Sequence, residues 1–594
     1  MNFRMYVLGL IVAACFGTTE AQNDISFANT IKIDPDDTPE VIIRKAAHVL
    51  PDHRQIAALK NEFIAFACYG PNSFTRREWG TGLEDPEVFS PSAIDTDQWV
   101  CAMKNAGMSM VILTAKHHDG FVLWQSRYTD HGVMSSPFMN GKADVMRSLS
   151  ESCRKYGMKL GIYLSPADLH EIESPNGRYG NLSKKTLRTI PGKVEGRPFA
   201  NHTTFEFVVD DYNEYFLNQL FELLTEYGPI DEVWFDGAHP KRKGGQTYDY
   251  SAWKKLIYTL APEAVIFGRE GTRWCGNEAG QTRPTEWNVI PYTANPDTMT
   301  VFPDLTAFDL GSRDRLLEGT YLHYHPAETD VSIRDGWFFR DDDKQHVRTA
   351  DDIFDIYERS VGGNSILLLN IPPNRDGRFS ARDSTVIAEV GHRIRTTYST
   401  NLLTGSDAPD AILDTDFNSA VSIDSLLVIT PPQSMTFNRL MLQEPVAHSG
   451  ERIEEHAVDA WINSEWKQIA EATNIGYKRI LRFPEVTTDR IRIRVISSRE
   501  VPYLSTVGAY YYRKPAKNIS DSLVTTPRCL PRENWTITST AQNPGHSVMF
   551  AIDNDPATFW CAPSEGTCLT IDLNKPYPIH GLIYSPQTIE RGSV

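Results

Sequence analysis

Two acidic residues, Asp236 and Glu278, have neighbours that suit a catalytic carboxylate. Asp236 directly follows the strand-like run Glu232–Phe235 and precedes a glycine, so its carboxylate would be exposed and rigidly aimed. Glu278 has a glycine two residues away on each side, and these let its loop bend. Hydrolysis of a glycosidic bond needs two carboxyl groups, one as nucleophile or base and one as acid. Taken singly, Asp236 could also cap a helix, and Glu278 could be an ordinary loop glutamate.

The run His117-His118-Asp119 contains residue types that bind metals. Adjacent residues on a strand point to opposite faces, so one metal ion rarely binds both histidines. No third ligand stands at a suitable spacing, and we therefore expect no metal. Hydrogen bonding to ligand hydroxyl groups is the more natural role, and a structural role for one histidine stays open.

Four tryptophans have two interpretations, stacking on a sugar or packing in a core. They are Trp79, Trp124, Trp234 and Trp337.

The elements that must hold these residues alternate along the chain. From about residue 60 to residue 375, short apolar runs alternate with amphipathic helices, which is typical of parallel strands joined by helices. The pattern predicts an α/β fold, a TIM-like (β/α) barrel over residues 45–392, with the polar residues where its strands end. The expected strands are Phe63–Tyr69, Met108–Thr114, Met158–Leu164, Glu232–Phe235, Ala264–Phe267 and Ile366–Ile371.

Beyond about residue 395 the helical periodicity ends, and short alternating strands with Pro, Gly and Asn turns follow. This pattern predicts a β-sandwich over residues 396–513, followed by a linker over residues 514–527. The stretch that begins at Ala551 faintly repeats the stretch that begins at Ala411. We therefore expect a partial second sandwich over residues 528–594.

Residues 1–21 have the features of a signal peptide. Arg4 supplies a positive charge, Val7–Phe16 is an apolar stretch, and Thr19-Glu20-Ala21 is a small-x-small cleavage site. Val12-Ala13-Ala14-Cys15 also resembles a bacterial lipoprotein box, which would lipidate Cys15. We expect an exported protein that is periplasmic, anchored to the outer membrane as a lipoprotein, or secreted.

The charge balance of the 594-residue chain excludes some partners. It has 59 Lys and Arg against 76 Asp and Glu, a net charge of −17, which argues against nucleic acid and against an anionic membrane surface. After the signal-like segment no apolar run of about 20 residues predicts a membrane span. The eight cysteines contain no C-x-x-C pair, and only Cys561 and Cys568 are near enough in sequence to suggest a disulfide.

An ordered set of motifs resembles glycoside hydrolase family 29, the α-L-fucosidases. The Gly-Asn-Glu-x-Gly stretch, together with Thr285-Glu-Trp287, resembles the branch that prefers α-1,3 and α-1,4 linkages. The resemblance covers about residues 45–515, and the region beyond is similar to discoidin-like (F5/8 type C) carbohydrate-binding domains. The matching motifs are Glu78-Trp79-Gly80, Ala115-Lys-His-His-Asp-Gly-Phe-Val-Leu-Trp124, Trp234-Phe-Asp-Gly237, Gly276-Asn-Glu278 and Asn364-Ser-Ile-Leu-Leu-Leu-Asn-Ile-Pro-Pro373.

The resemblance implies a role for each matching residue. Asp236 matches the nucleophile and Glu278 the acid/base of a retaining mechanism. Glu270 and Glu286 are alternative candidates for the acid/base. They lie 34 and 50 residues beyond Asp236, and Glu278 lies 42 residues beyond it, but only Glu278 stands in the matching loop. The positions that line the fucose pocket of the family are matched by Glu78, Trp79, His117, His118, Tyr163 and Trp337.

Two positions depart from the family pattern. The family usually has a histidine in the first strand that contacts a sugar hydroxyl, and Cys68 stands there in this chain. A thiol is a weak hydrogen-bond partner. The third-strand loop also reads Ser165-Pro-Ala-Asp168 where Ser-Pro-Trp-Asp is usual. Both changes concern which sugar is preferred rather than whether hydrolysis occurs.

The sequence therefore predicts an exo-acting, retaining α-L-fucosidase that needs no cofactor. Its expected substrates are fucosylated oligosaccharides or glycoconjugates, with α-1,3/1,4-linked terminal fucose. Two alternatives stay open: a glycosidase for a related sugar such as α-L-galactose, and a non-catalytic glycan-binding protein. Because both Asp236 and Glu278 are present, the binding protein is the less favoured alternative.

Overall fold

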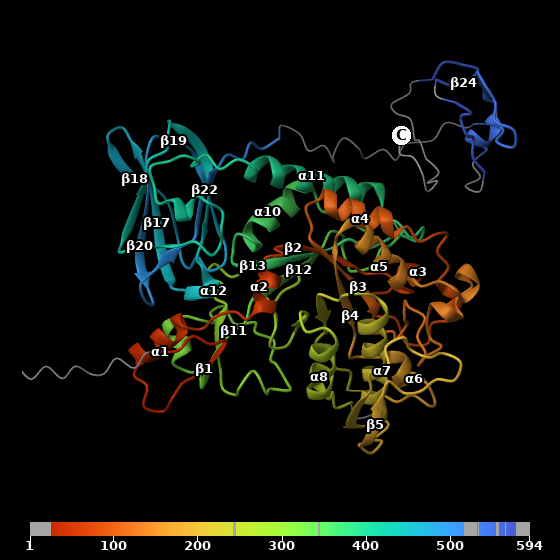
Figure 1. Cartoon of the computed structure of the whole chain (residues 1–594), viewed down its shortest axis with the longest axis horizontal. Helices are drawn as coiled ribbons and strands as arrows, with labels where there is room; N and C mark the ends of the chain where they lie inside the picture. The colour runs from red at the N-terminus through yellow and green to blue at the C-terminus, as the bar shows by residue number, and fades with distance from the viewer. Residues whose placement is uncertain are drawn as a thin grey trace, which may run out of the picture. The chain divides into compact units, whose positions relative to one another are not determined.

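The computed structural model describes residues 25–241, 245–342, 345–515, 532, 534–553, 558–564 and 566–577. The chain divides into two compact units, Met1–Ser522 and Leu523–Val594, and each is described by itself (Figure 1). The expected signal peptide, its Cys15 and residues 516–527 of the expected linker lie outside the described residues. None of the helices in the described part of the chain is both long enough and apolar enough to cross a membrane.

The first unit contains the predicted barrel. Every pairing in its eight-stranded sheet is parallel. An isolated bridge between Phe267 and Thr272 connects the two ends of the sheet, so the barrel is nearly closed. In sheet order the strands are β8 (Val265–Phe267), β7 (Glu232–Trp234), β4 (Lys159–Leu164), β3 (Met110–Lys116), β2 (Phe63–Ala67), β13 (Ser365–Asn370), β12 (Ala327–Ser332) and β9 (Arg273–Trp274).

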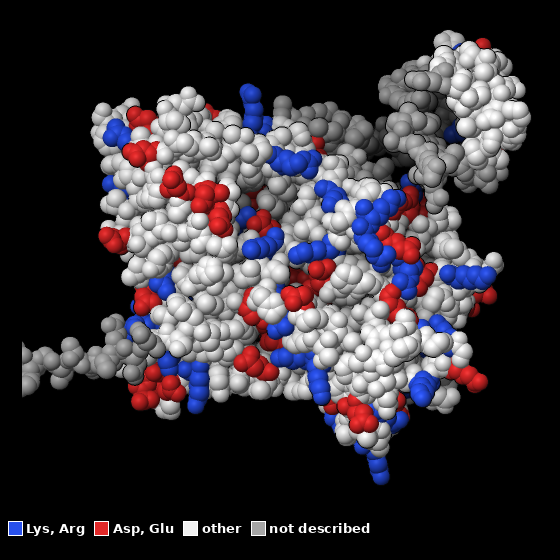
Figure 2. Space-filling model, viewed as in Figure 1, with Lys and Arg blue, Asp and Glu red and all other residues white. Residues whose placement is uncertain are grey.

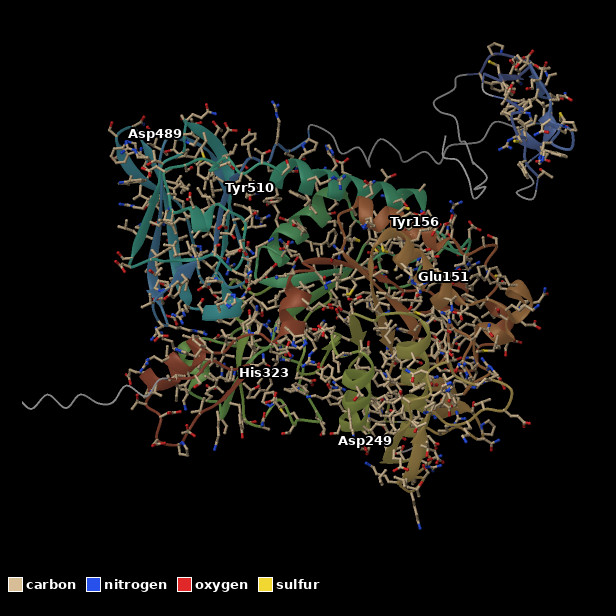
Figure 3. All side chains as sticks on the ribbon, in the orientation of Figure 1. Glu151, Tyr156, Asp249, His323, Asp489 and Tyr510 are labelled. Atoms are coloured by element: carbon tan, nitrogen blue, oxygen red, sulfur yellow. The ribbon has the colours of Figure 1, made fainter. Side chains whose placement is uncertain are left out.

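Helices cover the outside of the barrel. Capping side chains fix the starts of the longer helices; for example, Asp249 accepts a hydrogen bond from the Ala252 amide at the start of α8 (Figure 3). The longer helices are α4 (Thr96–Asn105), α5 (Val145–Tyr156), α7 (Asp211–Glu226), α8 (Tyr250–Leu260), α10 (Ala350–Ser360) and α11 (Ala381–Tyr398). The shorter ones are α1 (Pro39–Ala47), α2 (His53–Leu59), α3 (Asn72–Thr75), α6 (Leu169–Glu173) and α9 (Arg313–Leu316).

The alternation of side chains along each strand separates two cores. Ala65 and Ile162 belong to the core between the strands and the helices. Phe66, Tyr163 and Trp234, each adjacent in sequence to an outward residue, belong to the core that includes the barrel interior. The inward set is the one that leads to the carboxyl ends of the strands, where a barrel presents its functional residues.

Several elements of the first unit were not predicted. Strands β9 and β12 belong to the barrel, and β12 is buried along its whole length although Glu328 and Asp330 are acidic. The others form a small antiparallel sheet of β1 (Thr30–Lys32), β11 (Tyr321–Tyr324) and β10 (Val289–Tyr292), and a hairpin of β5 (Thr186–Ile190) and β6 (Phe205–Val209).

The predicted β-sandwich follows α11. Two antiparallel sheets enclose a core that includes Phe437, Leu440 and Ile493. One sheet has the order β15 (Leu426–Ile429), β20 (Ile491–Ser498), β17 (Ile453–Ile462), β18 (Glu465–Ala472) and the other β19 (Arg479–Thr488), β16 (Met435–Gln443), β22 (Thr506–Tyr510). The short pair β14 (Val421–Ser422) and β21 (Tyr503–Leu504), and α12 (Val446–Ser449), complete it.

The second unit is described only in part. Its described residues contain one antiparallel pair, β23 (Thr536–Ser539) and β24 (Leu569–Asp572). Cys561 and Cys568 are free thiols, so the suggested disulfide is absent from the described residues. The discoidin-like sandwich expected over residues 528–594 lies partly outside the described residues and stays a prediction.

The surface reflects the mixed charge composition. Figure 2 shows acidic and basic side chains interspersed over the face in view, with no continuous basic stripe on that face. A nucleic acid would need such a stripe to bind its phosphates.

Candidate active site

Asp236 lies two residues beyond β7, at the carboxyl end of the barrel. Its Oδ1 accepts a hydrogen bond from the Ala238 amide at 2.7 Å, which fixes the carboxylate in a tight turn. Its Oδ2 accepts one from the Tyr163 hydroxyl at 3.2 Å and lies 3.8 Å from His118 Nε2. The alternative role as a helix cap is wrong, because the next helix in the described part of the chain, α8, is capped by Asp249.

His117 and His118 follow β3, and their ring centroids are 4.2 Å apart. Burial lowers the pKa of both rings, and the charge of Asp236 partly offsets this at His118. Both rings are therefore neutral at neutral pH and act as hydrogen-bonding groups. His118 Nδ1 is bonded to Ser165 Oγ at 2.7 Å, which leaves Nε2 on the side of Asp236. The half-exposed ring of Trp79 lies 4.2 Å from the His118 ring.

Glu78, Trp337 and Glu278 form a second group at the barrel mouth. The Trp337 amide donates to Glu78 Oε2 at 2.8 Å, and its indole Nε1 donates to Glu278 Oε2 at 3.3 Å. Burial raises the pKa of Glu78, whereas Glu278 is exposed to solvent. Gly336 is required here, since a Cβ at its φ of +81° would lie 2.2 Å from Glu78 Oε1.

Phe66 and Cys68 connect the two groups. The Phe66 ring lies 5.6 Å from Tyr163 and 6.2 Å from Trp337. Cys68 is 2% exposed, and its amide donates to Asn370 Oδ1 at 3.1 Å. Burial raises the pKa of its thiol, and the nearby carboxylates, which include Asp236, Glu78 and Glu278, raise it further. The structure thus places Asp236, Glu278, Glu78, Trp79, His117, His118, Tyr163, Trp337 and Cys68 in one cluster.

The inward face of β12 adds acidic residues that sequence reasoning missed. The Trp274 indole donates to Asp330 Oδ1 at 2.9 Å, and the Trp234 indole donates to Glu328 Oε1 at 2.9 Å. Burial raises the pKa of Asp330 well above its usual value, and Glu278 contributes to this shift. The period-two spacing of Glu328, Asp330 and Ser332 is the signal of an inward polar face that could have indicated them.

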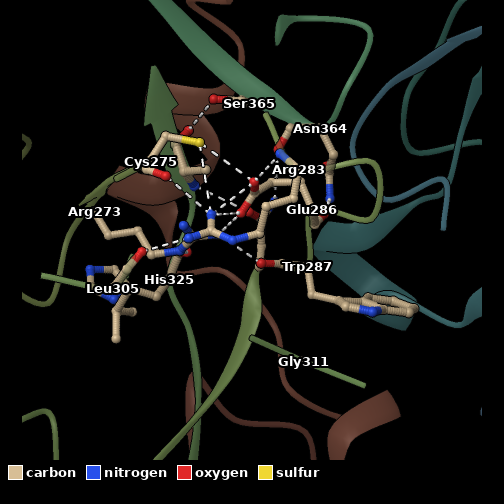
Figure 4. Close-up of polar contacts among 12 residues, drawn as sticks. Arg273, Cys275, Arg283, Glu286, Trp287, Leu305, Gly311, His325, Asn364 and Ser365 are labelled. Carbon is tan, nitrogen blue, oxygen red and sulfur yellow. Dashed lines mark hydrogen bonds and ion pairs between the residues drawn. The ribbon is translucent and has the colours of Figure 1, made fainter. Parts of the chain in front are cut away.

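The two alternative candidates for the acid/base, Glu270 and Glu286, make hydrogen bonds and ion pairs outside this cluster. Glu270 accepts hydrogen bonds from the hydroxyls of Tyr250 at 2.6 Å and Tyr258 at 2.8 Å. Glu286 is fully buried between Arg273 at 2.5 Å and Arg283 at 3.0 Å (Figure 4). Although its burial opposes the effect, the two guanidinium groups lower the pKa of Glu286. A carboxyl group that is held ionised in this way is a poor proton donor.

We predict that Glu286→Gln destabilises the fold. The change removes the negative charge between two buried guanidinium groups, and breaking a buried pair costs about 3–5 kcal/mol of unfolding free energy. Because the folded pKa is lowered, the stability due to the charge is present above the unfolded pKa, about 4.3, and is lost as the pH falls through the folded value. Urea denaturation of both proteins at neutral pH measures the loss, and equal midpoints would contradict the prediction.

Other polar residues near the strand ends have structural roles. Asp168 pairs with the buried Lys116 at 3.0 Å and caps α6. Trp124 is buried in the outer core, where its indole donates to Glu222 at 2.9 Å. Burial raises the pKa of Asp119 to about 8, and its Oδ1 accepts from the Phe121 amide. Within the described ranges no group of three or more His, Cys, Asp or Glu side chains is arranged to hold a metal ion.

Comparison with known proteins identifies the family of the chain. The sequence profile described as "Alpha-L-fucosidase" matches residues 60–397, more than half of the chain and the whole barrel. The chain belongs to the α-L-fucosidase family. Alpha-L-fucosidase 1 of Arabidopsis thaliana is 34% identical over 508 residues, which are 82% of this chain and 92% of the relative.

Solved structures of α-L-fucosidase relatives share the fold. One of them is a protein from Bacteroides ovatus ATCC 8483 that is named as an α-L-fucosidase by assignment. It is 36% identical to this chain, with a TM-score of 0.71, and the match covers 87% of this chain and 82% of the other. The GH29 fucosidase of Ruminococcus gnavus, solved in complex with fucose, is 28% identical, with a TM-score of 0.65, over 78% of this chain and 95% of its own.

Proposed function

We propose that this member of the α-L-fucosidase family is an exo-acting, retaining α-L-fucosidase with Asp236 as nucleophile and Glu278 as acid/base. The observation that supports this most is that both carboxylates lie in one cluster at the barrel mouth, within an α-L-fucosidase sequence. Asp236 accepts hydrogen bonds from the Tyr163 hydroxyl and the Ala238 amide, and these two donors orient its carboxylate for attack. Glu278 is exposed and accepts one indole hydrogen bond, which leaves its carboxyl free to exchange protons with a substrate oxygen.

The proposed reaction has two displacements. Asp236 attacks the anomeric carbon, the bond to the leaving oxygen breaks, and Glu278 gives its proton to that oxygen. Glu278 then takes a proton from water, the water oxygen bonds to the anomeric carbon, and the bond to Asp236 breaks. Retention requires the two carboxyl groups to lie about 5–5.5 Å apart in the working enzyme.

The other residues of the cluster are proposed to bind the sugar. The neutral His117, His118 and Tyr163 offer hydrogen bonds to hydroxyl groups, and the buried His117 Nδ1 has no hydrogen-bond partner among the described residues. Glu78 is held by the Trp337 amide and can accept from a sugar hydroxyl. The half-exposed Trp79 can cover an apolar sugar face.

The proposed substrate is a fucosylated oligosaccharide or glycoconjugate, with α-1,3- or α-1,4-linked terminal fucose. Support for the linkage is the sequence resemblance of the Glu278 loop to the branch that prefers these linkages. Product analysis on a panel of fucosylated and L-galactosylated oligosaccharides tests it. Faster release of L-galactose would favour the related-sugar alternative, and binding without hydrolysis of any member would favour a glycan-binding protein.

We also propose export, on the signal-like features of residues 1–21 alone. Amino-terminal sequencing of the protein from its native cells tests this, and a mature chain that starts at Gln22 is expected. The lipid anchor at Cys15 and the discoidin-like nature of residues 528–594 rest on sequence features only. Binding of fucose-free glycans by the full chain, lost on removal of residues 528–594, is the expected result for a carbohydrate-binding region.

We predict that Cys68→His raises kcat/KM for simple aryl α-L-fucosides by about tenfold, since 1.4 kcal/mol is one decade. The neutral, buried thiol of Cys68 is a weak partner for a sugar hydroxyl, and an imidazole would restore the donor. Cys68→Leu, which adds volume without a donor, is the matched control and should lower activity. Unchanged or reduced fucosidase activity in a folded Cys68→His variant would mean that Cys68 does not limit fucose recognition.

A further inference from the structure

The loop that carries Glu278, residues 275–288, ends against the β-sandwich. The side chain of Asn474, in the connection between β18 and β19, donates from Nδ2 to the carbonyl oxygen of Glu286 at 2.7 Å. Its neighbour Thr473 donates from Oγ1 to the carbonyl oxygen of Pro284 at 3.1 Å. Asn474 is fully buried, so its amide, together with Asn364 Nδ2 at 2.9 Å, replaces water as a partner of this carbonyl.

Two further sandwich residues hold the last positions of the same loop. Glu451 Oε2 accepts from the Asn288 amide at 2.9 Å and is fully buried. The guanidinium carbon of Arg499 lies 3.6 Å from the centre of the Trp287 ring, which is a close cation–π contact. The sandwich therefore makes hydrogen bonds to the backbone of the loop and places the charged Arg499 side chain on the ring of Trp287.

Arg283 transmits this anchorage to the start of the loop. Its Nη1 donates to the carbonyl oxygen of Cys275 at 3.1 Å and to the Glu286 carboxylate at 3.0 Å (Figure 4). Its Nη2 donates to the carbonyl oxygen of Leu305 at 2.6 Å. Glu278 lies three residues after Cys275, between the two ends of the loop that these contacts hold. A shift of the end that the sandwich holds would therefore move the backbone that carries the Glu278 carboxyl group.

We propose that the β-sandwich is a positioning element of the active site: Thr473 and Asn474, through Pro284 and Glu286, hold the loop so that the Glu278 carboxyl reaches the leaving oxygen. The inference rests on the proposed acid/base role of Glu278. Its physical basis is that proton transfer needs donor and acceptor at hydrogen-bond distance, and a misplacement of about 1 Å can cost about a hundredfold in rate. Thr473 and Asn474 are positioning residues, since neither contacts Glu278 in the described structure.

The test compares two substrates in the full-length Asn474→Ala variant. A fucosylated disaccharide has a poor leaving group that needs the proton of Glu278, whereas 4-nitrophenyl α-L-fucoside needs little protonation. We expect kcat/KM to fall about tenfold or more for the disaccharide and less than about threefold for the aryl fucoside. A purely structural role would lower both by the same factor, because it changes only the fraction of folded enzyme.

Thr473→Val is the second, milder variant, because it exchanges a hydroxyl for a methyl group of similar size and should shift the same ratio in the same direction. Thr436→Val is the matched control. The Thr436 hydroxyl is hydrogen-bonded to the Thr487 hydroxyl at 2.8 Å on the exposed sandwich surface. Thr487 lies two residues before Asp489, which is labelled in Figure 3. Its ratio should equal that of the wild type.

Equal losses on both substrates, or an unchanged ratio in both Asn474→Ala and Thr473→Val, would overturn the positioning role. If Asn474→Ala does not fold, the ratio in Thr473→Val decides. A wild-type protein that hydrolyses neither substrate would instead reject the proposed function, so the two failures are distinguishable.

Discussion

Asp236→Asn is expected to abolish turnover of fucosides while their binding survives. The amide is nearly isosteric with the carboxylate and can keep hydrogen bonds to Ala238 and Tyr163, but it is a poor nucleophile. A loss in kcat on the order of 10³-fold or more is expected, as for other enzymes that lose a covalent nucleophile. Steady-state kinetics measures the loss, and calorimetry with a fucoside measures the binding that remains.

Azide provides the positive control for this assignment. In Asp236→Ala the removed side chain leaves space beside the anomeric carbon, and azide can attack there in its place. We expect azide to restore turnover and to give fucosyl azide of inverted configuration. Asp297→Asn, which changes an exposed carboxylate outside the cluster, should retain wild-type activity. Full activity in Asp236→Asn would remove Asp236 as the nucleophile.

Glu278→Gln is expected to slow substrates according to their leaving group. General acid catalysis contributes about 10²–10⁴-fold, and this contribution is lost when the leaving oxygen must depart unprotonated. We expect a loss in that range for fucosylated oligosaccharides and a much smaller loss for 4-nitrophenyl α-L-fucoside in the first displacement. Pre-steady-state rates of the first displacement on both substrates measure the difference.

Glu286→Gln is the matched comparison for Glu278→Gln. Glu286 is a buried member of an ion-pair cluster, and its change should lower stability rather than select between leaving groups. If Glu286→Gln shows the leaving-group dependence and Glu278→Gln does not, the acid/base assignment is wrong.

The strands that carry apolar residues on both faces were the ones that could be predicted. Strands β2, β3, β4 and β7 are buried on both sides, so each produces a short apolar run bounded by polar residues. Prediction of these runs also placed Asp236 at a strand end. The matching apolar face of α5 supported the alternation of strands and helices.

Strand β12 could not be recognised in the same way. Its inward residues Glu328 and Asp330 are acidic, and their burial is possible only because the indoles of Trp234 and Trp274 donate hydrogen bonds to them. The two tryptophans lie 94 and 56 residues away in sequence, so no local pattern indicates these hydrogen-bond pairings. A polar strand of this kind reads as a loop when only local hydrophobicity is considered.

The anchorage of the Glu278 loop was also outside the reach of sequence patterns. The resemblance to the family indicated Glu278, and the rivals Glu270 and Glu286 could be ranked only by motif. The structure separates them physically, because Glu286 lies between two arginines and Glu270 between two tyrosine hydroxyls. The contribution of Asn474 to the same loop comes from another domain, 188 residues from Glu286 in sequence.

The central claim, that Asp236 forms a covalent bond to the sugar, is tested most directly by trapping the intermediate. The 2-fluorine of a 2-deoxy-2-fluoro fucosyl fluoride slows both displacements, and its good fluoride leaving group keeps the first one fast enough for a glycosyl-enzyme to accumulate. The trapped protein can then be digested and sequenced by mass spectrometry. We predict one added sugar per chain, on the peptide that contains Trp234-Phe235-Asp236, with the modification at Asp236. A label on Glu278 or on any other residue would contradict the account.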